Sequence, residues 1–539
     1  MFPIEDLIAD AQTRAIPRYS PRDLVLTASP GQARVLIGMR RVGKTFACFQ
    51  EMDRLVRSGI DRRRILYLNL EDDRLGSPTP DLLSTVLETF YRMSPDARAD
   101  GAFLFLDEVQ AVPEWARFAR RVLDTERVRL HITGSSAKML STDVATEFRG
   151  RGLAVDVWPF SFAEYARHMG EPAVSVRYPG AVDRSKLEAL FLRYLRTGGF
   201  PGVAAMDDRE RVQTLQDYVE LVVVRDTVER HRLTNITAVR AFILMLVQST
   251  GRLFTVNKTY RDLKSRGVEV GKDLLHAVLG HASDASLAFT VGRFSRSVRE
   301  RAVRPRKVYA VDPGLASAVS LATTRDTGAR LETAVYVELR RRLGRTRDGA
   351  IAYYVTDDGH EVDFVTGDAE QGEATAIVQV CADLSDPATR GRELRALDEG
   401  MTELRRDTAT LVTLHETGEE RVRGVLDGCP GVELAVLFGS VTRRGTLARD
   451  IDIGVWVTTE EGPHNLSRSD SGYSAGARPW CDVMSQARKS RERRRGWTMP
   501  RSGSATMSTC SRTIGSGAIW RSSICSWRFR SASISRPIG

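Results

Sequence analysis

The fold of the N-terminal part is decided by Arg34-Val-Leu-Ile37 and the segment that follows it, Gly38-Met-Arg-Arg-Val-Gly-Lys-Thr45. The first four residues have strand character, and a helix-like pattern continues after the glycine-rich segment to about Val56. A G-x-x-x-x-G-K-T pattern between a strand and a helix is typical of a phosphate-binding loop, or P-loop. The sequence therefore predicts a nucleotide site at this loop.

The chemistry of phosphate binding explains the spacing of these residues. Gly38 and Gly43 let the backbone curl so that its N–H groups face the phosphates at the start of a helix. Lys44 would reach the β- and γ-phosphates, and Thr45 would supply a hydroxyl ligand to Mg²⁺. The predicted loop is completed by Arg40, Arg41 and Val42.

A second element of the predicted site is the run Ala102-Phe-Leu-Phe-Leu-Asp-Glu108, a buried-strand pattern that ends in two carboxylates. Asp107 would hold Mg²⁺, directly or through water. Glu108 would be the general base toward the attacking water, with Lys44 as the other catalytic residue. A solvated Asp-Glu pair at a strand end is the alternative.

Two further runs, Ile65 to Leu70 and Arg129 to Thr133, predict additional parallel strands. Strands that alternate with helical segments form a doubly wound α/β layer. The second run leads into Gly134-Ser-Ser136, and we expect Thr133 or Ser135 to sense the γ-phosphate. A plain polar turn is the alternative there.

The expected nucleotide is ATP, with Mg²⁺. GTPases usually read guanine with an Asn-Lys-x-Asp loop, whereas the Asn-Lys pair at Asn257 is followed by Thr259-Tyr260 and lies well outside the predicted P-loop domain.

The composition is that of a globular protein, with 42% hydrophobic and 27% charged residues. The N-terminus lacks the pattern of a signal peptide, and the apolar runs fall short of the ~18 residues of a membrane helix. We therefore expect a cytoplasmic protein without a membrane partner. The cysteines show no CxxC spacing, which favours free thiols over a zinc site or a disulfide framework.

The net charge of +10 belongs to the C-terminal tail. Residues 463–539 contain 14 Lys and Arg against 3 Asp and Glu, which leaves 65 against 66 in residues 1–462. The body is near neutral, so its charge does not argue for DNA binding. The tail is rich in Ser and Arg and holds four of the seven tryptophans. We interpret residues 462–539 as disordered and translated out of frame; a genuine basic tail that binds nucleic acid is the alternative.

The ordered set of motifs resembles a group of prokaryotic AAA-family ATPases with a winged-helix segment and a C-terminal restriction-endonuclease-like domain of unknown function. The resemblance covers about residues 15–425 and rests on these segments: 38–45, 104–110, 132–136, 150–151, 159–165, 198–201, 307–312 and 361–364. It implies that Arg151 contacts nucleotide, in its own chain or from a neighbouring subunit of a homo-oligomer. A surface arginine is the alternative.

The resemblance places a winged helix from Thr234 to about Ala316. Phe254-Thr-Val-Asn-Lys would open a helix-turn-helix, and Gly271 to Leu279 would be its second helix. Six arginines follow that could face DNA phosphates: Arg293, Arg296, Arg299, Arg301, Arg304 and Arg306. A solvated wing is the alternative, and some winged helices contact protein rather than DNA.

Residues 325–425 resemble the nuclease-like fold, with a helix from Leu331 to Arg340 and the metal-binding Asp363 on a strand. An active member would carry Glu-x-Lys on a further strand, where this chain has Gln379 and Cys381. An amide is a poor Mg²⁺ ligand and a thiol carries no positive charge. We therefore predict that this domain is inactive as a nuclease.

A weak second site is predicted near residues 437–454. Leu437-Phe-Gly-Ser440 and the later Asp450-Ile-Asp452 resemble polymerase-β-like minimal nucleotidyltransferases, in which Gly439 and Ser440 would grip the triphosphate. Asp450 and Asp452 alternate along one strand and would face one metal pair. The foreign-looking tail follows closely, so we interpret this as the opening fragment of a domain.

The expected fold class is α/β. A doubly wound P-loop domain (1–165) is followed by a helical lid (166–233), a winged-helix-like region (234–320), a restriction-endonuclease-like domain (325–425), a nucleotidyltransferase fragment (426–461) and the tail. The expected function is ATP hydrolysis coupled to the winged-helix and nuclease-like regions, with DNA or an unknown protein as partner. A DNA-tethered ATP switch with little turnover and a nucleotidyltransferase of the toxin–antitoxin type are the alternatives.

Overall fold

The computed structural model describes residues 4–134, 148, 150–171, 181–320, 327–344 and 349–414, with the backbone alone for residues 181–184 and for strands 432–436 and 454–456. The chain divides into two compact units, residues 1–462 and 463–539. All the elements below belong to the first unit.

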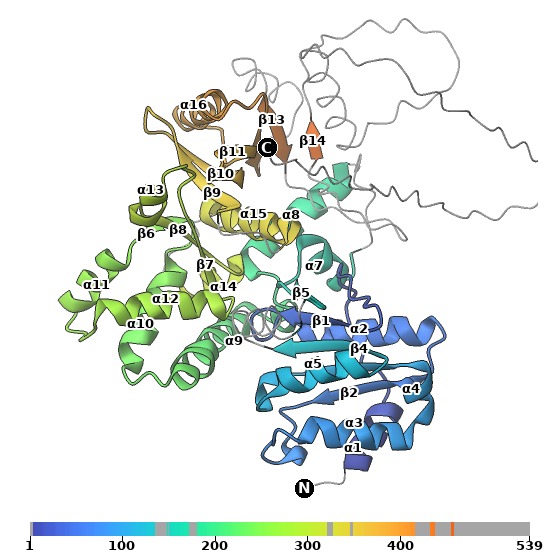
Figure 1. Ribbon diagram of the computed structural model, residues 1–539. Helices are drawn as coiled ribbons and strands as arrows, with labels where there is room; N and C mark the ends of the chain where they lie inside the picture. Colours follow the sequence, from blue (N-terminus) through green and yellow to red (C-terminus); the bar gives the residue numbers. More distant parts are fainter. Residues whose placement is uncertain are drawn as a thin grey trace, which may run out of the picture. The chain divides into compact units, whose positions relative to one another are not determined.

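The N-terminal elements form a parallel five-stranded sheet of order β2-β3-β4-β1-β5 with helices on both faces (Figure 1). Its strands are β1 (Gln32–Ile37), β2 (Ile65–Asn69), β3 (Ala102–Asp107), β4 (Val128–Gly134) and β5 (Gly152–Asp156). Its helices are α1 (Ile4–Thr13), α2 (Lys44–Arg57), α3 (Leu82–Met93), α4 (Pro95–Asp100) and α5 (Trp115–Thr125). Three 3₁₀ turns lie at Arg62–Arg64, Asp73–Leu75 and Val109–Ala111.

Side chains that alternate along the strands supply two separate cores. In β1, Leu36 packs with α2 on one face, while Val35 and Ile37 pack with α1, α3 and α5 on the other. The same alternation divides Phe103 and Phe105 from their neighbours in β3, because successive side chains of a strand point to opposite faces. The predicted doubly wound α/β layer is confirmed.

A mainly helical region follows. It contains α7 (Phe162–His168), α8 (Ala181–Thr197), a 3₁₀ turn (Pro201–Val203), α9 (Asp208–Leu221) and the π-helix η5 (Val222–Glu229). Helix α7 begins at a capping box, in which Ser161 and Glu164 each bond the other's backbone N–H.

The next region carries a three-stranded antiparallel sheet of order β6-β8-β7. Its elements are α10 (Ile236–Gln248), β6 (Arg252–Phe254), α11 (Val256–Ser265), α12 (Lys272–Asp284), β7 (Ala288–Val291), α13 (Val298–Val303), β8 (Arg306–Ala310) and α14 (Pro313–Val319). Helices α10, α11 and α12 pack on one another, and α10 and α12 also contact the sheet.

The last region is a six-stranded sheet of order β14-β13-β12-β11-β10-β9. Its elements are α15 (Thr327–Leu343), β9 (Ile351–Val355), β10 (Glu361–Asp368), β11 (Glu373–Val380), α16 (Pro387–Glu403), β12 (Ala409–Thr413), β13 (Val432–Val436) and β14 (Gly454–Trp456). Strands β13 and β14 fall in the predicted nucleotidyltransferase fragment, and β13 pairs with β12 in this same sheet.

One apolar cluster connects these regions. It runs from the α2 face of the first sheet through α9 and α10 to α15 and the strands around Phe364. None of the described helices is both long and apolar enough to span a membrane.

Candidate nucleotide-binding site

The predicted phosphate-binding loop joins β1 to α2 at the carboxyl edge of the first sheet. Gly38 lies so close to the next strand end that a Cβ there would stand 2.2 Å from the carbonyl oxygen of Val157. Gly43 has φ 96°, in the left-handed region, and precedes the first turn of α2. Both positions require glycine, and the loop leads into the N-terminus of α2, where the backbone N–H groups of a helix can bind anions.

Lys44 lies folded into the loop that it follows. Its Nζ donates hydrogen bonds to the carbonyl oxygens of Gly38 (3.0 Å) and Met39 (3.1 Å), and the residue is buried. Burial lowers the pKa of Lys44, while the charges of Glu108 and Asp107 oppose this shift. A buried ammonium bonded only to carbonyl oxygens can exchange them for phosphate oxygens, which carry a full charge.

Asp107, at the end of β3, is the centre of the site. Its Oδ2 accepts hydrogen bonds from the hydroxyls of Thr45 (2.7 Å) and Tyr67 (2.8 Å), and its Oδ1 accepts one from Thr133. Thr133 lies at the end of strand β4, which runs between β1 and β3. The Thr133 hydroxyl therefore lies between the loop that follows β1 and the carboxylates that end β3. The structure thus brings together the three parts that the sequence predicts for this site: the loop, the strand end at Asp107 and the strand end at Thr133.

Tyr67 is a member of this group that sequence reasoning missed. Burial, and next the charge of Asp107, raise the pKa of its hydroxyl, so it stays a neutral donor. The signal for Tyr67 in the sequence was weak: a residue with a polar tip among the apolar side chains of Ile65, Leu66 and Leu68.

Glu108 follows Asp107 in a left-handed conformation, with φ 54°. Its backbone N–H donates to Thr133 Oγ1 (3.0 Å), and its side chain Oε2 accepts a hydrogen bond from Gln110 Nε2 (2.6 Å). Left-handed backbone in a residue other than glycine is uncommon and is concentrated at functional sites. Thr133 therefore positions Asp107 and Glu108 together.

A buried ion pair is hydrogen-bonded to the backbone of the loop. Arg22 Nε lies 3.0 Å from Glu164 Oε1, and its Nη1 donates to the carbonyl oxygen of Val42 (2.9 Å). Burial acts to raise the pKa of Glu164, but Arg22 and Arg341 outweigh it, and the pKa is lowered. Sequence reasoning quoted Glu164 within a motif without a role, and it missed Arg22.

The chain matches two family models. Residues 31–166 match an AAA domain, and residues 188–326 match a domain of unknown function. The strand order, the loop and the Asp107 network lie within the first match. Residues 31–166 form an AAA-type P-loop domain.

The relatives found are uncharacterized proteins. One, from Methanocaldococcus jannaschii, is 29% identical over 404 residues, which are 74% of this chain and 86% of that protein. Another, from Haemophilus influenzae, is 25% identical over 355 residues, which are 66% and 83% of the two chains. Among solved structures, the Orc1 protein of Aeropyrum pernix in complex with DNA matches at 15% identity and a TM-score of 0.25, over 53% of this chain and 86% of that one.

Arg40 connects the AAA domain to the helices that follow it. Its Nε lies 3.1 Å from Oδ2 of Asp226, a buried residue of the π-helix η5, and its Nη1 lies 3.9 Å from Glu71. Arg230 Nη2 lies 3.1 Å from the other oxygen of Asp226. Two guanidinium groups therefore share one buried carboxylate.

The remaining predicted residues of the AAA domain lie in different places. Arg41 is exposed with φ 68°, and Val42 is fully buried. Arg151 precedes β5 at the amino edge of the sheet, opposite the loop, where it pairs with Asp124 and donates to Leu123. The expectation that Arg151 contacts nucleotide within its own chain is therefore wrong, since the strands separate it from the loop. Ser135 lies outside the described residues, as do Gly439, Ser440, Asp450 and Asp452 of the weak second site.

The predicted nuclease-like site contains a lysine that sequence reasoning did not place there. Lys307 Nζ lies 2.8 Å from Asp363, 2.8 Å from Glu361 and 2.9 Å from Glu332. Burial acts to lower the pKa of Lys307, but these carboxylates outweigh it and raise the pKa above its ordinary value. Gln379 Oε1 accepts a hydrogen bond from the N–H of Asp363 (3.1 Å).

Proposed function

We propose that this protein binds ATP at the loop of residues 38–45 and hydrolyses it. The observation that carries the proposal is the hydrogen-bonded group of Thr45, Asp107 and Thr133 beside the buried Lys44. Lys44 would bind the β- and γ-phosphates, and Glu108 would take a proton from the attacking water. Thr133 would hold the Asp107 carboxylate and the Glu108 backbone in place and contact the γ-phosphate.

The donor set also fits Mg²⁺. A hydroxyl and a carboxylate, Thr45 and Asp107, already contact each other, and hard oxygen ligands of this kind are those that Mg²⁺ prefers. When bound, the cation would neutralise charge on the phosphates.

Steady-state ATP hydrolysis by the full chain tests this proposal. We expect Lys44→Ala to weaken ATP binding, and Glu108→Gln to retain binding but lower the turnover roughly a hundredfold or more, as loss of a general base does. The matched control is Glu114→Gln, because Glu114 is an exposed glutamate that also has positive φ, 55°. Hydrolysis that neither Lys44→Ala nor Glu108→Gln lowers would refute the site.

We further propose that Arg40 couples nucleotide to the later regions. A phosphate would compete with Asp226 for the Arg40 guanidinium, and Arg230 would remain on Asp226, so no buried charge would be left unpaired. The π-helix that holds Asp226 contacts α9, α10 and α12. Inserted π turns often occur at functional sites.

Hydrogen exchange of residues 222–229 tests the coupling. We expect ATP to change the exchange rate in the wild-type chain, and Arg40→Ala to raise the rate without ATP and remove the response. Arg57→Ala is the control, since Arg57 is an exposed arginine that pairs with Asp53 at the far end of α2. An identical response to ATP in Arg40→Ala and in wild type would contradict the coupling.

A second candidate function is an ATP-binding switch with slow turnover. It is favoured by the Gln110 side chain, which holds the Glu108 carboxylate at 2.6 Å and so competes with a water for that oxygen. If this restraint limits the rate, Gln110→Ala should raise the turnover while leaving ATP affinity unchanged. A lower turnover would mean that Gln110 positions Glu108 productively.

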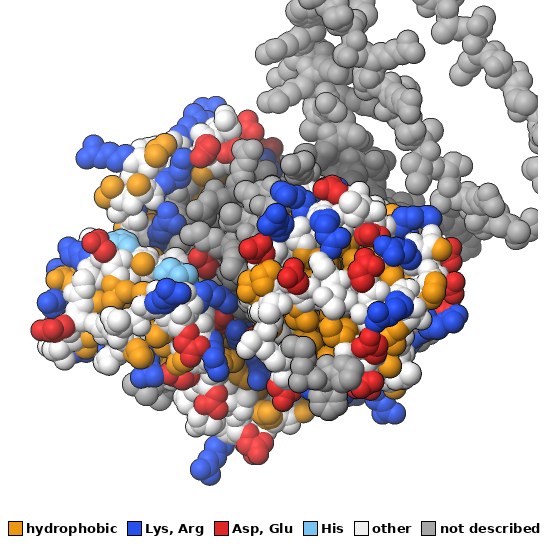
Figure 2. Space-filling model, turned by 60° about the horizontal axis from the view of Figure 1, so that its bottom comes forward, with side chains coloured by type: hydrophobic (Ala, Val, Ile, Leu, Met, Phe, Trp, Pro, Cys, Tyr) orange, Lys and Arg blue, Asp and Glu red, His pale blue; other side chains and the backbone are white. Residues whose placement is uncertain are grey.

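DNA contact through residues 234–320 is a proposal supported by their order of elements. Two helices, α11 and α12, precede the antiparallel strands β7 and β8, as in a winged helix. On the face in Figure 2, basic and acidic side chains are interspersed, which agrees with the near-neutral body. Binding of labelled duplex DNA over a salt series tests the proposal; affinity that does not fall with salt would contradict phosphate contact.

We propose that the nuclease-like region does not cleave DNA. The ammonium of Lys307 already lies among the carboxylates of Glu332, Glu361 and Asp363, and Gln379 stands where an anionic ligand would be needed. Cleavage of supercoiled DNA in Mg²⁺ that Asp363→Asn abolishes would contradict this.

A further inference from the structure

A cavity of about 250 Å³ lies away from the nucleotide site, between the strands β7 and β8 and the helix α15. We call it the arginine pocket. It is lined by Thr290, Val291, Gly292, Arg293, Arg301, Arg306, Tyr336, Arg340, Gly349, Ile351, Ala352 and Glu370. Segments far apart in the sequence thus bring four arginines and one glutamate to one cavity.

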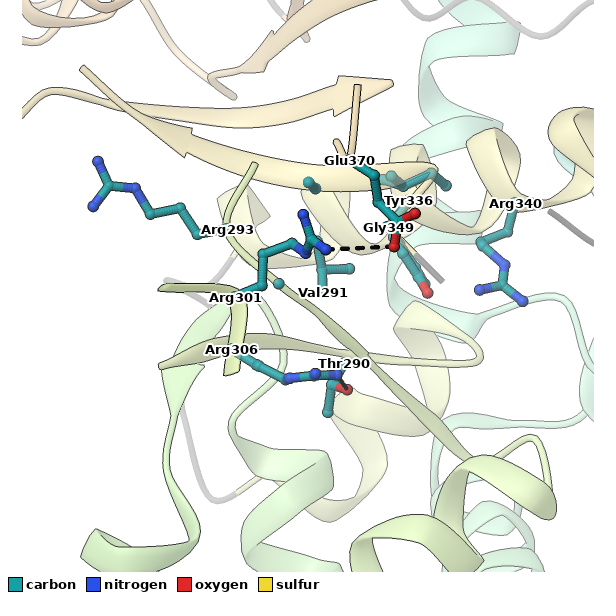
Figure 3. A pocket seen from close by; sticks show the side chains of 12 residues that line it. Thr290, Val291, Arg293, Arg301, Arg306, Tyr336, Arg340, Gly349 and Glu370 are labelled. Atoms are coloured by element: carbon teal, nitrogen blue, oxygen red, sulfur yellow. Dashed lines mark hydrogen bonds and ion pairs between the residues drawn. The ribbon is translucent and has the colours of Figure 1, made fainter. Parts of the chain in front are cut away.

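The guanidinium groups have few carboxylate partners among the described residues, although Arg301 Nη1 donates a hydrogen bond to the carbonyl oxygen of Ser295 (2.8 Å). Arg301 Nη2 lies 3.4 Å from Glu370, whose side chain is 70% exposed. Arg306 Nη1 donates to Thr290 Oγ1 at 3.3 Å, and among the described residues no carboxylate pairs with it. Arg293 donates to the carbonyl oxygen of Val355 (2.9 Å), and its guanidinium points away from the others (Figure 3).

Arg340 faces the pocket from the opposite side to Arg301 and Arg306 (Figure 3). Its guanidinium lies over the rings of Phe289 (5.1 Å) and Trp158 (5.9 Å), which hold it in place. Its Nε is buried, and within the described part of the chain it has no hydrogen-bond partner. A buried donor without an acceptor is costly unless a ligand or water supplies one.

These features fit one class of ligand. Three guanidinium groups on two sides of a cavity, against one solvated carboxylate, leave a local excess of positive charge. Guanidinium forks match the geometry of phosphate oxygens and can bind them in pairs of hydrogen bonds. The cavity lies below the ~300–1,000 Å³ of pockets that enclose drug-sized ligands, so the ligand is compact.

We propose that the arginine pocket binds a compact phosphate anion, as inorganic phosphate, pyrophosphate or the phosphate group of a nucleotide. Arg301, Arg306 and Arg340 supply the hydrogen bonds, and Tyr336 and Ala352 line the wall of the cavity. The residues that line this site lie outside residues 31–166, and the site does not require hydrolysis at the P-loop.

Calorimetric titration of the full chain with pyrophosphate tests the proposal. All proteins carry Lys44→Ala, which weakens binding of phosphates at the P-loop. We expect one site, with an affinity that falls roughly tenfold or more in Arg306→Gln and in Arg340→Gln, as loss of a charged hydrogen bond predicts. Arg299→Gln is the matched control, because Arg299 is an exposed arginine of the adjacent α13 that does not line the pocket.

The variants separate binding from folding. Arg340 packs on two aromatic rings, so Arg340→Gln could lose stability, whereas Arg306 makes one long hydrogen bond and Arg306→Gln should fold. If Arg340→Gln unfolds, Arg306→Gln decides the outcome. Titrations with phosphate and with AMP identify the source: similar affinities mean that the phosphate group alone is recognised, and tighter binding of AMP means a nucleotide.

Two results would overturn the proposal. One is the absence of pyrophosphate binding, or binding that neither Arg306→Gln nor Arg340→Gln weakens. The other is a tenfold loss of duplex DNA affinity in both variants without any binding of pyrophosphate, which would assign these arginines to a nucleic-acid surface.

Discussion

Asp107 accepts three hydroxyl hydrogen bonds while its side chain is almost fully removed from water. Neutral donors stabilise a buried carboxylate less than a cation does. The arrangement therefore holds the Asp107 carboxylate in a position where it can exchange the Thr45 hydroxyl for a shared cation. Thr133 contributes most to this geometry, since it also accepts from the N–H of Glu108.

Substitution of Thr133 by Val should lower ATP turnover roughly tenfold or more, because Asp107 loses a donor and Glu108 loses its backbone anchor. ATP affinity should change much less. Thr133→Ser keeps the hydroxyl and is the matched control. Single-turnover hydrolysis with bound ATP measures the effect; equal rates in Thr133→Val and Thr133→Ser would mean that the hydroxyl has no role.

His131 in β4 predicts an acid sensitivity of the AAA domain. Its ring stacks on Phe105 at 4.3 Å, and its Nε2 lies 2.9 Å from the carbonyl oxygen of Leu26. Burial lowers the pKa of His131 to about 4. Between its unfolded pKa of about 6.5 and about pH 4, the unfolded chain binds a proton that the folded chain does not, so stability falls as the pH falls, by about 3 kcal/mol at most.

The comparison of His131→Phe with wild type at pH 7 and pH 4.5 isolates the contribution of His131 to the loss of stability at low pH. Unfolding in guanidinium chloride should show that the variant loses less stability than wild type between pH 7 and pH 4.5. The unpaired carbonyl of Leu26 adds a cost that is the same at both. A pH dependence equal to that of wild type would show that His131 is charged in the folded protein.

At the scale of elements, the turn from β1 to α2 is set by Gly43, whose φ of 96° places the N-terminus of α2 at the loop. A side chain in left-handed backbone costs about 1–2 kcal/mol. Gly43→Ala should therefore lower stability by about that amount and also weaken ATP binding.

Gly59→Ala is the matched control for Gly43→Ala. Gly59 has φ 90°, follows α2 at its other end and has open space around its Cβ position. It should carry a similar backbone cost without any effect on ATP binding. Thermal unfolding without ATP measures the loss of stability, and its shift on addition of ATP measures ATP binding. Equal stabilisation by ATP in the two variants would contradict the proposed role of the loop.

At the scale of the whole molecule, Lys307 joins two regions through charge. It lies on β8, while its carboxylate partners lie on α15 and β10. Burial, and next the charge of Asp363, raise the pKa of Glu332 to about 7. The cluster thus contains more carboxylates than the single ammonium can neutralise. Removal of that ammonium should leave these carboxylates without a cationic partner.

Lys307→Met should destabilise the protein by about 3–5 kcal/mol, the usual cost of breaking a buried ion pair from one side. Addition of Asp363→Asn should restore part of the loss, because one unpaired charge is removed. The exposed Lys264 on α11 provides the control Lys264→Met, with a change within about ±0.5 kcal/mol. The melting temperature is measured for wild type, Lys307→Met, the double variant and Lys264→Met. If the double variant were no more stable than Lys307→Met, Lys307 would act by packing alone.

Sequence reasoning was most accurate where the signal is local. The loop of residues 38–45, the strand that ends at Asp107 and the strand that leads to Thr133 each carry their pattern within a few residues, because strand burial and glycine spacing are properties of the chain itself. Arg151 shows the limit: its motif was recognised, but its place at the far edge of the sheet follows from strand direction.

The linear order of residues thus sufficed for the nucleotide loop, its carboxylates and the α/β class, since adjacent residues create those features. The pairing of Arg40 with Asp226, 186 residues later, could not be read in that way. Neither could the enclosure of Lys307 or the convergence of Arg301, Arg306 and Arg340, because contacts between distant segments depend on how whole elements pack. Packing brings those charged groups together and so determines which carboxylates and phosphates they can bind.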